Sequence, residues 1–350
     1  MLSRRNFIKL AGGAAAAGLA AGSLAACSSG GDATQASGSA SSATAATDTD
    51  VEVTIRFADT GPNGIYLASY ANETGILQEV FSDYPNVSFE FNEFKTGSAI
   101  NEAYAANELD FALLGLFPVI TGTSADYGFK ALATTSYSEN AASLFVGVDS
   151  GIESVEDLAG HTVGTLIGGG YQYNTYQFLT QAGLTTDDVE LINTGAETAA
   201  SVQNGEVDAG VYAILNGRKA QAAGEAIVIS EDTGGPDFAV ITGSEAFVAS
   251  YPDLAALVLQ AFAQTVAYQV EHYDEYTEYY VGKSGSEASD LDEIWDLLLH
   301  EVNLPGQLEY DGAQGMLDWL IDTDQLTNAD FTTDELFDLS VAQAAGLSEQ

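Results

Sequence analysis

One supersecondary unit occurs twice in this chain, and this repetition limits the possible folds most strongly. Thr96-Gly97 leads through a predicted helix to Asn107-Glu108-Leu109-Asp110, and Thr194-Gly195 leads in the same way to Gly205-Glu206-Val207-Asp208. The interval from Thr to Asp is 14 residues in both copies, and the copies are 98 residues apart. A predicted strand precedes each copy and another ends it. The pattern therefore predicts two similar α/β lobes.

The rest of the chain also alternates between strand and helix patterns. Apolar and polar residues alternate over 51–57 and 87–91, which predicts two strands. A helix is predicted between them over about 65–81, and an apolar run predicts a buried strand over 109–114. Such alternation is typical of an α/β fold with a mostly parallel sheet. Apolar residues at helical spacing predict one long helix over 252–280.

The charge balance excludes several classes of partner. The chain has nine Lys and Arg residues against 51 Asp and Glu, a net charge of −42. Nucleic acid is excluded because phosphate binding needs clustered cations. Broad adhesion to anionic lipid is excluded for the same reason. No calcium-binding loop pattern occurs, so the acidity is interpreted as a solvated, self-repelling surface.

The N-terminus has the features of an export signal. Ser3-Arg4-Arg5-Asn6-Phe7-Ile8-Lys9 fits a twin-arginine pattern, and Leu24-Ala25-Ala26-Cys27 fits a lipobox. The apolar run between them is short and broken by Gly, too weak for a transmembrane anchor. We therefore predict a lipoprotein signal peptide over 1–26, and a lipidated Cys27 with a flexible tether over 27–50. The chain would be exported and anchored to the outer face of the cytoplasmic membrane.

Cys27 is the only cysteine of the chain. Once it is lipidated, the remaining chain has no disulfide framework, no thiolate metal site and no cysteine nucleophile. About 300 residues stay available for folding, enough for two lobes with a large core.

Several loops that precede predicted helices are rich in Gly and hydroxyl residues. The first turn of a helix has unpaired N–H groups and the positive end of the dipole. Gly lets the backbone approach a ligand, and such starts bind anions without needing Lys or Arg. Plain N-capping is the alternative for any single start. The four loops are Gly61-Pro62-Asn63-Gly64, Thr96-Gly97-Ser98, Gly115-Leu116-Phe117-Pro118 and Gly168-Gly169-Gly170-Tyr171.

Several longer segments resemble a known family. The segments are 105–115, 151–164, 178–189 and 204–209, together with Tyr251-Pro252 at the start of a long helix. With the export signal, they resemble the solute-binding lipoproteins of ABC importers. The best match is the group that binds aliphatic sulfonates, taurine and nitrate, whose domain is shared with binders of thiamine-pyrimidine precursors. The resemblance covers about residues 51–345.

The resemblance implies a fold and a set of partners. It implies a two-lobed periplasmic-binding-protein fold, type II-like, in which each lobe is a mostly parallel sheet flanked by helices. Two crossover strands would join lobe one, residues 51–144 plus 244–345, to lobe two, residues 145–243. The family acts as monomers that deliver a ligand to the membrane subunits of the permease, without a cofactor.

Positions on the matching loops give the candidate ligand-binding residues. The few cations left in the mature chain add Lys95 and Arg218 as anion partners, whereas Arg56 lies within a strand and is expected to form a structural ion pair. The tyrosines over 273–280 are expected to be packing or surface residues, and Trp295 and Trp319 are expected to lie in the core. The candidates are Asn63, Tyr66, Lys95, Thr96, Gly97, Ser98, Gly115, Phe117, Gly169, Gly170, Tyr171, Tyr212 and Arg218.

The ligand stays open at this point. The helix starts favour a small organic anion such as an aliphatic sulfonate or taurine. Nitrate or bicarbonate sites of related proteins tend to use Lys and His, which are scarce here. A neutral aromatic compound resembling a thiamine precursor would fit between Tyr66, Phe117, Tyr171 and Tyr212.

Two other classes of function need to be weighed. An enzyme is disfavoured because the chain has only three His, no metal-binding motif and no nucleophile with a matching base. A surface adhesin on the same fold is the other alternative, and it would not close on any small molecule.

Overall fold

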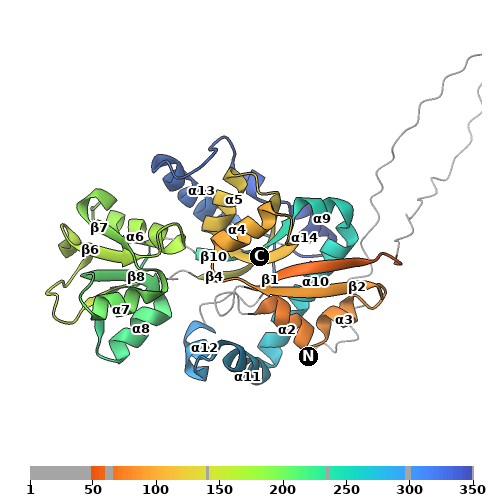
Figure 1. Ribbon diagram of the computed structural model, residues 1–350, viewed down its shortest axis with the longest axis horizontal. Helices are drawn as coiled ribbons and strands as arrows, with labels where there is room; N and C mark the ends of the chain where they lie inside the picture. The colour runs from red at the N-terminus through yellow and green to blue at the C-terminus, as the bar shows by residue number, and fades with distance from the viewer. Residues whose placement is uncertain (1–48, 60–65, 139–141, 234–236, 296–300, 349–350) are drawn as a thin grey trace, which may run out of the picture.

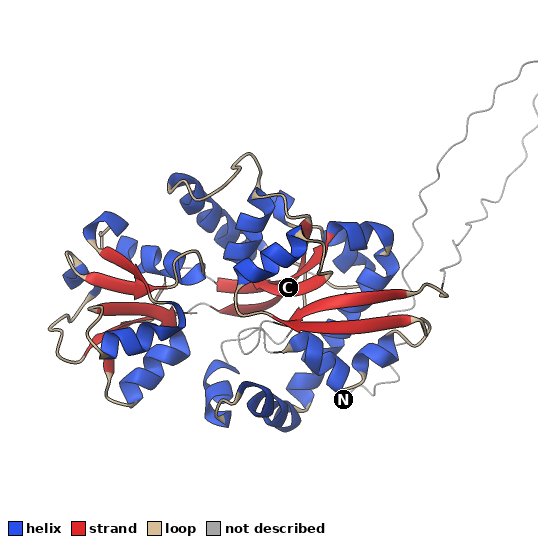
Figure 2. Ribbon diagram, viewed as in Figure 1, coloured by secondary structure: helices blue, strands red, loops and turns tan. Residues whose placement is uncertain are grey.

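The computed structural model describes residues 49–59, 66–138, 142–233, 237–295 and 301–348. They form two lobes, each built on one five-stranded sheet with helices on both faces (Figures 1 and 2). The predicted α/β, two-lobed fold is confirmed. Asn63 and Cys27 lie outside the described residues.

The first sheet has the strand order β2-β1-β3-β10-β4. Strands β1, β2 and β3 are parallel, whereas β10 is antiparallel to both β3 and β4. Four of the five strands therefore run in one direction. The strands are β1 (Val53–Asp59), β2 (Val87–Glu93), β3 (Phe111–Gly115), β4 (Phe129–Ser138) and β10 (Asp237–Ser244).

The second sheet repeats this layout with the order β7-β6-β8-β5-β9. Strands β6, β7 and β8 are parallel, and β5 is antiparallel to β8 and β9. In each sheet the antiparallel strand is the first one that the chain forms after crossing from the other lobe. The strands are β5 (Ala142–Gly147), β6 (Thr162–Thr165), β7 (Glu190–Asn193), β8 (Ala209–Ala213) and β9 (Ala226–Ser230).

Ten of the described helices belong to the lobe of the first sheet, and three to the lobe of the second. The first lobe has α2 (Leu67–Glu73), α3 (Ile76–Val80), α4 (Gly97–Ala105), α5 (Leu116–Ser124), α9 (Glu245–Ser250), α10 (Pro252–Glu271), α11 (Tyr273–Ser284), α12 (Ala288–Trp295), α13 (Gln307–Asp322) and α14 (Leu339–Ala344), with the 3-10 turn η5 (Thr333–Leu336). The second has α6 (Gly170–Gln181), α7 (Thr198–Gln203) and α8 (Ile214–Ala222), with the 3-10 turns η2 (Val155–Leu158), η3 (Thr186–Asp188) and η4 (Gly195–Glu197).

Each sheet separates two apolar cores. In β3, Phe111 and Leu113 pack into the core on one face, while Ala112 and Leu114 pack into the core on the other. A strand that is apolar on both faces is what a central strand between two helical layers requires. A fully buried side chain such as Phe57 stabilises the fold by about 1.5–3 kcal/mol relative to exposure.

The repeated unit seen in the sequence has the same role in both sheets. Asp110 precedes β3 and its Oδ2 accepts the N–H of Arg56 in β1 at 2.8 Å. Asp208 precedes β8 and its Oδ2 accepts the N–H of Thr162 in β6 at 2.9 Å. The Asp110 carboxylate thus fixes the start of β3 against β1, and the Asp208 carboxylate fixes the start of β8 against β6.

Two predicted helices are interrupted in the structure. The helix expected over 65–81 is divided into α2 and α3 at Gly75, which has a φ of 75°. The helix expected over 252–280 is divided into α10 and α11 at His272, whose ring stacks on Tyr268 at 4.0 Å. The change of direction lets Tyr276 pack in the core. Among the described residues, no helix is long and apolar enough to cross a membrane.

Candidate functional site

The candidate site lies where the carboxyl ends of the parallel strands lead into helices. In open α/β sheets these ends carry the ligand-binding loops. Helices α4 and α5 start there in lobe one, and α6 and α8 start there in lobe two. In Figure 1 the helices of lobe one nearest to lobe two are α13, above the space between the lobes, and α12, below it.

The two helix starts of lobe one lie side by side. A Cβ atom added at Gly97 would meet the side chain of Pro118 at 2.7 Å, so only Gly allows this approach. Asn101 of α4 also donates its side-chain amide to the carbonyl of Pro118 at 2.8 Å. The structure therefore brings together the predicted loops at Thr96–Ser98 and at Gly115.

The start of α4 has polar groups that are exposed to solvent. The Thr96 hydroxyl accepts the N–H of Ala99 at 3.2 Å and caps the helix. Ser98 and Lys95 are exposed, and their side chains form no hydrogen bond or ion pair with the described residues. Gly115, at the start of α5, is also exposed.

Lys95 differs from the other cations that follow the signal peptide. Six Lys and Arg residues remain beyond Lys9. Within the described ranges, Lys95 is the one for which no partner is found. The other five form contacts with Asp110 (Arg56, 2.7 Å), Glu245 (Lys130, 4.0 Å), Glu231 (Arg218, 2.9 Å), Asp290 (Lys219, 2.5 Å) and the Tyr66 ring (Lys283, 5.5 Å).

Arg56 forms the structural ion pair that the sequence predicts. Its guanidinium donates to both carboxylate oxygens of Asp110, at 2.9 and 2.7 Å. The pKa of Arg56 is raised, chiefly by this hydrogen bonding to Asp110. Arg218 likewise donates to both oxygens of Glu231 at 2.9 Å, which raises its pKa. A ligand role for Arg218 stays a prediction, and it would have to compete with Glu231.

Tyr66 and Phe117 are more buried than a ligand-binding role suggests. Tyr66 is 3% exposed and packs against Tyr279 and Tyr280 of α11. Phe117 is 7% exposed and lies in the core beneath α5. Their roles in ligand binding stay predictions.

The Gly-rich loop of lobe two already uses part of its donors. The N–H of Gly168 donates to Gln172 at 2.8 Å, and the N–H of Ile167 donates to Asn193 at 3.2 Å. Gly168 has a φ of 78°, which favours Gly. Gly169 is the cap that precedes α6, and Gly170 is its first residue. The first turn of α6 is therefore the part of this loop that can receive an anion.

Two of the predicted aromatic residues are in contact. The rings of Tyr171, in the first turn of α6, and Tyr212, near the end of β8, lie 4.5 Å apart at 45°. Both are half-buried, and burial raises the pKa of Tyr212. This pair gives lobe two an apolar surface beside the helix starts.

The sequence analysis did not identify the contacts between the lobes. Trp319 of α13 packs against Tyr173 and Tyr176 of α6, and Lys219 of α8 forms an ion pair with Asp290 of α12. Burial raises the pKa of Tyr173 to about 12. The tyrosines at 171, 173 and 176, directly after three glycines, are the signal that could have indicated an aromatic surface.

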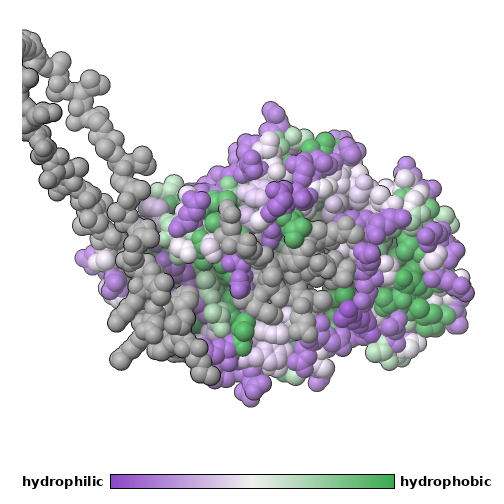
Figure 3. All heavy atoms as spheres, turned by 180° about the vertical axis from the view of Figure 1, so that it is seen from behind, coloured by the Kyte–Doolittle hydropathy of each residue, from purple (hydrophilic) through white to green (hydrophobic). Residues whose placement is uncertain are grey.

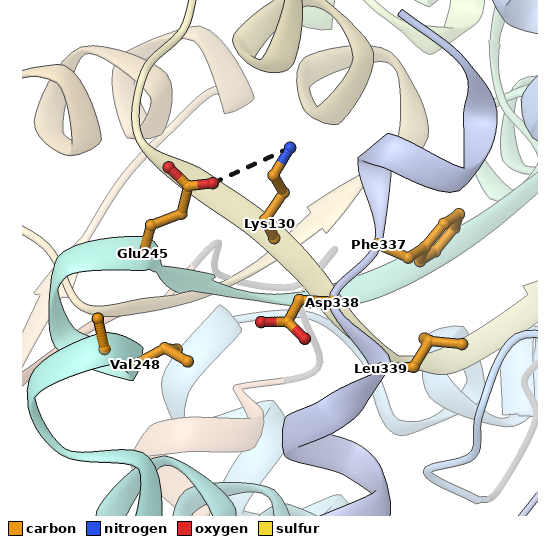
Figure 4. Close-up of a pocket in the computed structure, with 7 residues that line it drawn as sticks. Lys130, Glu245, Val248, Phe337, Asp338 and Leu339 are labelled. Atoms are coloured by element: carbon orange, nitrogen blue, oxygen red, sulfur yellow. Dashed lines mark ion pairs between the residues drawn. The ribbon is translucent and has the colours of Figure 1, made fainter. Parts of the chain in front are cut away.

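One pocket lies away from these loops (Figure 4). It has a volume of about 450 Å³ and lies where the beginning of β4 meets α9 and the segment before α14. Lys130 and Glu245 point toward one another there, 4.0 Å apart. Since β4 begins at this end, the pocket is opposite to the carboxyl ends of the strands. Figure 3 shows hydrophilic residues interspersed with hydrophobic areas on the part of this face that the described residues form.

Comparison with known proteins identifies the family. The sequence model described as "NMT1/THI5 like" matches residues 86–276, more than half of the chain. The chain belongs to the NMT1/THI5-like family. The match includes both copies of the repeated unit, and the family resemblance drawn from the sequence is confirmed.

Two named proteins similar to this NMT1/THI5-like chain are binding proteins. It is 30% identical over 231 residues to a Bacillus subtilis (strain 168) protein named for binding aliphatic sulfonates. The alignment covers 63% of this chain and 66% of that protein, so just under two thirds of the relative's length is matched. The periplasmic aliphatic sulphonate binding protein SsuA of Escherichia coli has a similar structure. Its TM-score is 0.69 at 19% identity, over 79% of this chain and 89% of that one.

The same fold also occurs in an enzyme. The desulfurization enzyme DSZB matches with a TM-score of 0.58 at 17% identity, over 84% of this NMT1/THI5-like chain and 96% of that one. At this identity the likeness shows the fold alone.

Proposed function

We propose that this chain is the solute-binding lipoprotein of an ABC importer that captures a small organosulfonate between its lobes. The adjoining starts of α4 and α5, beside the exposed Lys95, carry the proposal. The relationship to a protein named for binding aliphatic sulfonates supports the choice of ligand. The bound sulfonate would then be delivered to the membrane subunits of the permease.

A sulfonate matches the groups that the structure offers. It is a tetrahedral monoanion with three oxygens, which can each accept hydrogen bonds from N–H groups of a helix's first turn or from hydroxyls. The hydroxyl of Ser98 and the first-turn amides of α4 and α5 supply such donors, and Lys95 supplies the charge. A site of this kind needs only one cation, in keeping with the few cations of the chain.

The two lobes would close on the ligand by moving about the crossover segments. We propose that the chain passes between the lobes near the boundaries expected from the sequence, 144 and 243. The membership of β4 and β10 in one sheet and of β5 and β9 in the other supports crossings close to these positions.

A neutral aromatic ligand is the second candidate. The observation that favours it is the contact between the tilted rings of Tyr171 and Tyr212, which offers an apolar surface without a charge. Such a ligand would not depend on Lys95.

Export and lipid anchoring are supported by the N-terminal pattern alone. We expect the full chain to fractionate with membranes and Cys27→Ser to be released as a soluble, exported protein. Replacing Arg4 and Arg5 by Lys should keep the chain inside the cell. A Cys27→Ser chain that stays bound to the membrane would contradict lipid anchoring.

The ligand is tested by thermal unfolding of the soluble form that begins at Ser28. Taurine, ethanesulfonate, nitrate, bicarbonate and a thiamine pyrimidine precursor are the probes. Binding at 100 times Kd should stabilise the fold by about 2.7 kcal/mol. We expect a sulfonate to stabilise the fold in this way, and we expect Lys95→Ala to weaken the affinity for the sulfonate about tenfold.

Lys130→Ala is the matched control, since Lys130 lies in the distant pocket of lobe one. It should leave sulfonate binding unchanged. Stabilisation by the pyrimidine alone would favour the second candidate, and stabilisation by none of the probes would contradict both.

A further inference from the structure

An aromatic cluster joins the two lobes beside the candidate site. We call Phe117, Trp319, Tyr173 and Tyr176 the interlobe cluster. The Trp319 ring lies 6.3 Å from Phe117 of the same lobe, and 5.2 and 5.7 Å from Tyr173 and Tyr176 of the other lobe. Trp319 of lobe one thus contacts lobe two through its ring.

The position of the cluster places it at the edge of the ligand site. Phe117 lies in the first turn of α5, which begins at the carboxyl end of β3. Tyr173 lies in the fourth position of α6, whose start follows β6. Both helices therefore direct their first turns toward the space between the sheets, and Trp319 bridges them.

The indole N–H of Trp319 has no acceptor among the described residues, although the residue is only 4% exposed. An unpaired buried donor is costly, and in native proteins it calls for a partner. The rings of Tyr173 and Tyr176, which pack on Trp319, belong to the other lobe. A ligand oxygen that takes the place of part of this packing when the lobes close comes within reach of the indole N–H.

The backbone of α13 is shaped for this approach. Gly315 lies one turn before Trp319, on the same face of the helix. A Cβ atom at Gly315 would come within 3.0 Å of the Tyr173 hydroxyl. Gly therefore lets α6 come close to α13 at the place where Trp319 contacts it.

We propose that Trp319 is a specificity-determining residue whose Nε1–H donates a hydrogen bond to an oxygen of the bound organosulfonate. This inference rests on the proposed function and names one of its recognition groups. Trp319 donates without adding a charge, and its ring with Phe117 and Tyr173 excludes water from that side of the anion. A hydrogen bond to a charged acceptor is stronger in such a setting than in water.

The chain has only two tryptophans, Trp295 and Trp319, which makes the test direct. Trp295 packs on Tyr273 and Tyr276 of α11, away from the interlobe cluster. The 1H–15N NMR spectrum of the 15N-labelled soluble form should show two indole N–H signals. The signal that remains in the spectrum of Trp295→Phe then belongs to Trp319. Adding taurine or ethanesulfonate should move the Trp319 signal downfield and leave the Trp295 signal in place.

Binding measurements on two matched variants complete the test. Trp319→Phe keeps an aromatic ring and removes the N–H, and it should weaken sulfonate binding about 10- to 100-fold. Trp295→Phe should leave the affinity within threefold. The unfolding midpoint of each variant without ligand shows whether it is folded.

Three outcomes separate this inference from the proposed function. If the wild-type chain binds a sulfonate but Trp319→Phe binds it equally well, or the Trp319 signal does not move, the role of Trp319 is overturned and the function stands. If the wild-type chain binds no sulfonate, both are overturned. If Trp319→Phe is unfolded, the response of the Trp319 signal in Trp295→Phe decides.

Discussion

In both copies of the repeated unit, a carboxylate before a strand accepts a backbone N–H of a neighbouring strand, and we call this arrangement the frame. The other partners of the carboxylate differ between the two lobes. Asp110 in lobe one is bound by the guanidinium of Arg56, and its side chain is 5% exposed. Asp208 in lobe two is bound by the Thr162 hydroxyl at 2.9 Å and lies 3.2 Å from His161, and its side chain is 45% exposed. The frame therefore requires a carboxylate that accepts a backbone N–H, while its other partner can change.

The helix starts of the two copies differ in a way that bears on recognition. Thr96 caps α4 directly and is followed by the exposed Ser98. Thr194 instead precedes the 3-10 turn η4, and its hydroxyl is paired with Thr198 at 2.7 Å. Lobe one keeps donors available for an anion, whereas lobe two adds the aromatic pair. Under the proposed function, we expect the charged end of the ligand to face lobe one and its organic part to face lobe two.

Removal of the two carboxylates should give the largest difference in stability between the two copies. Asp110→Ala leaves the partly buried Arg56 without its partner, so we expect a loss of about 2–4 kcal/mol in the free energy of unfolding. Asp208→Ala removes hydrogen bonds from a half-exposed site, and we expect a loss of about 1 kcal/mol. Urea unfolding of both variants measures the difference, and equal losses would contradict it.

Gly97→Ala should be the next largest effect. The added methyl would meet Pro118 and push the first turns of α4 and α5 apart. We expect a loss of about 1–3 kcal/mol of stability and at least a tenfold weaker sulfonate affinity. Gly282→Ala in α11 is the matched control, since its added Cβ meets no atom within 4 Å and Gly282 is not among the candidate ligand residues. Calorimetric titration measures the sulfonate affinity of both variants. Equal affinities would contradict the placement of the anion site at the starts of α4 and α5.

Much of the fold follows from local patterns in the sequence. The strands over 53–59, 87–93 and 111–115 lie where period-2 alternation and an apolar run predict them. The repeat predicts the common layout of the two sheets. The break at His272 was not predictable, because apolar spacing continues across it and only packing of the tyrosines in the core reveals the bend.

The candidate site was less predictable than the fold. The contact of Gly97 with Pro118 joins two loops that the sequence analysis already named. The contact of Trp319 with α6 could not be predicted, because Trp319 is 146 residues from Tyr173 and 143 from Tyr176, in a different lobe. The amphipathic pattern around Trp319 predicted only that this residue is buried, which the structure confirms.

The aromatic pair of lobe two should affect the organic part of the ligand only. Tyr212→Ala removes one ring of the pair, and an aromatic contact contributes about 0.5–1.5 kcal/mol beyond area burial. We expect hexanesulfonate to lose about three- to tenfold in affinity and ethanesulfonate to lose little. Competition between the two ligands measures the ratio. An equal loss for both would show that Tyr212 does not contact the organic part.

The smallest effect is expected in the pH dependence of stability. The pKa of Asp208 is held below its ordinary value of 3.8, chiefly by the backbone N–H of Thr162. Since the folded state favours the ionised form, this stabilisation is complete above about pH 4 and is lost as the pH falls through the lowered pKa.

Asp208→Asn should therefore be less stable than the wild type at pH 6. The difference between their free energies of unfolding should become smaller as the pH falls below 3.8. Asp187→Asn is the control for the loss of one negative charge, because the Asp187 side chain forms no hydrogen bond or ion pair with the described residues. Urea unfolding between pH 6 and pH 2.5 gives both curves. A gap for Asp208→Asn that did not change with pH would mean that the hydrogen bonds of Asp208 act through geometry and not through its charge. The frame of lobe two would then depend on the shape of the residue before β8, and the contrast with the ion pair of lobe one would be sharper still.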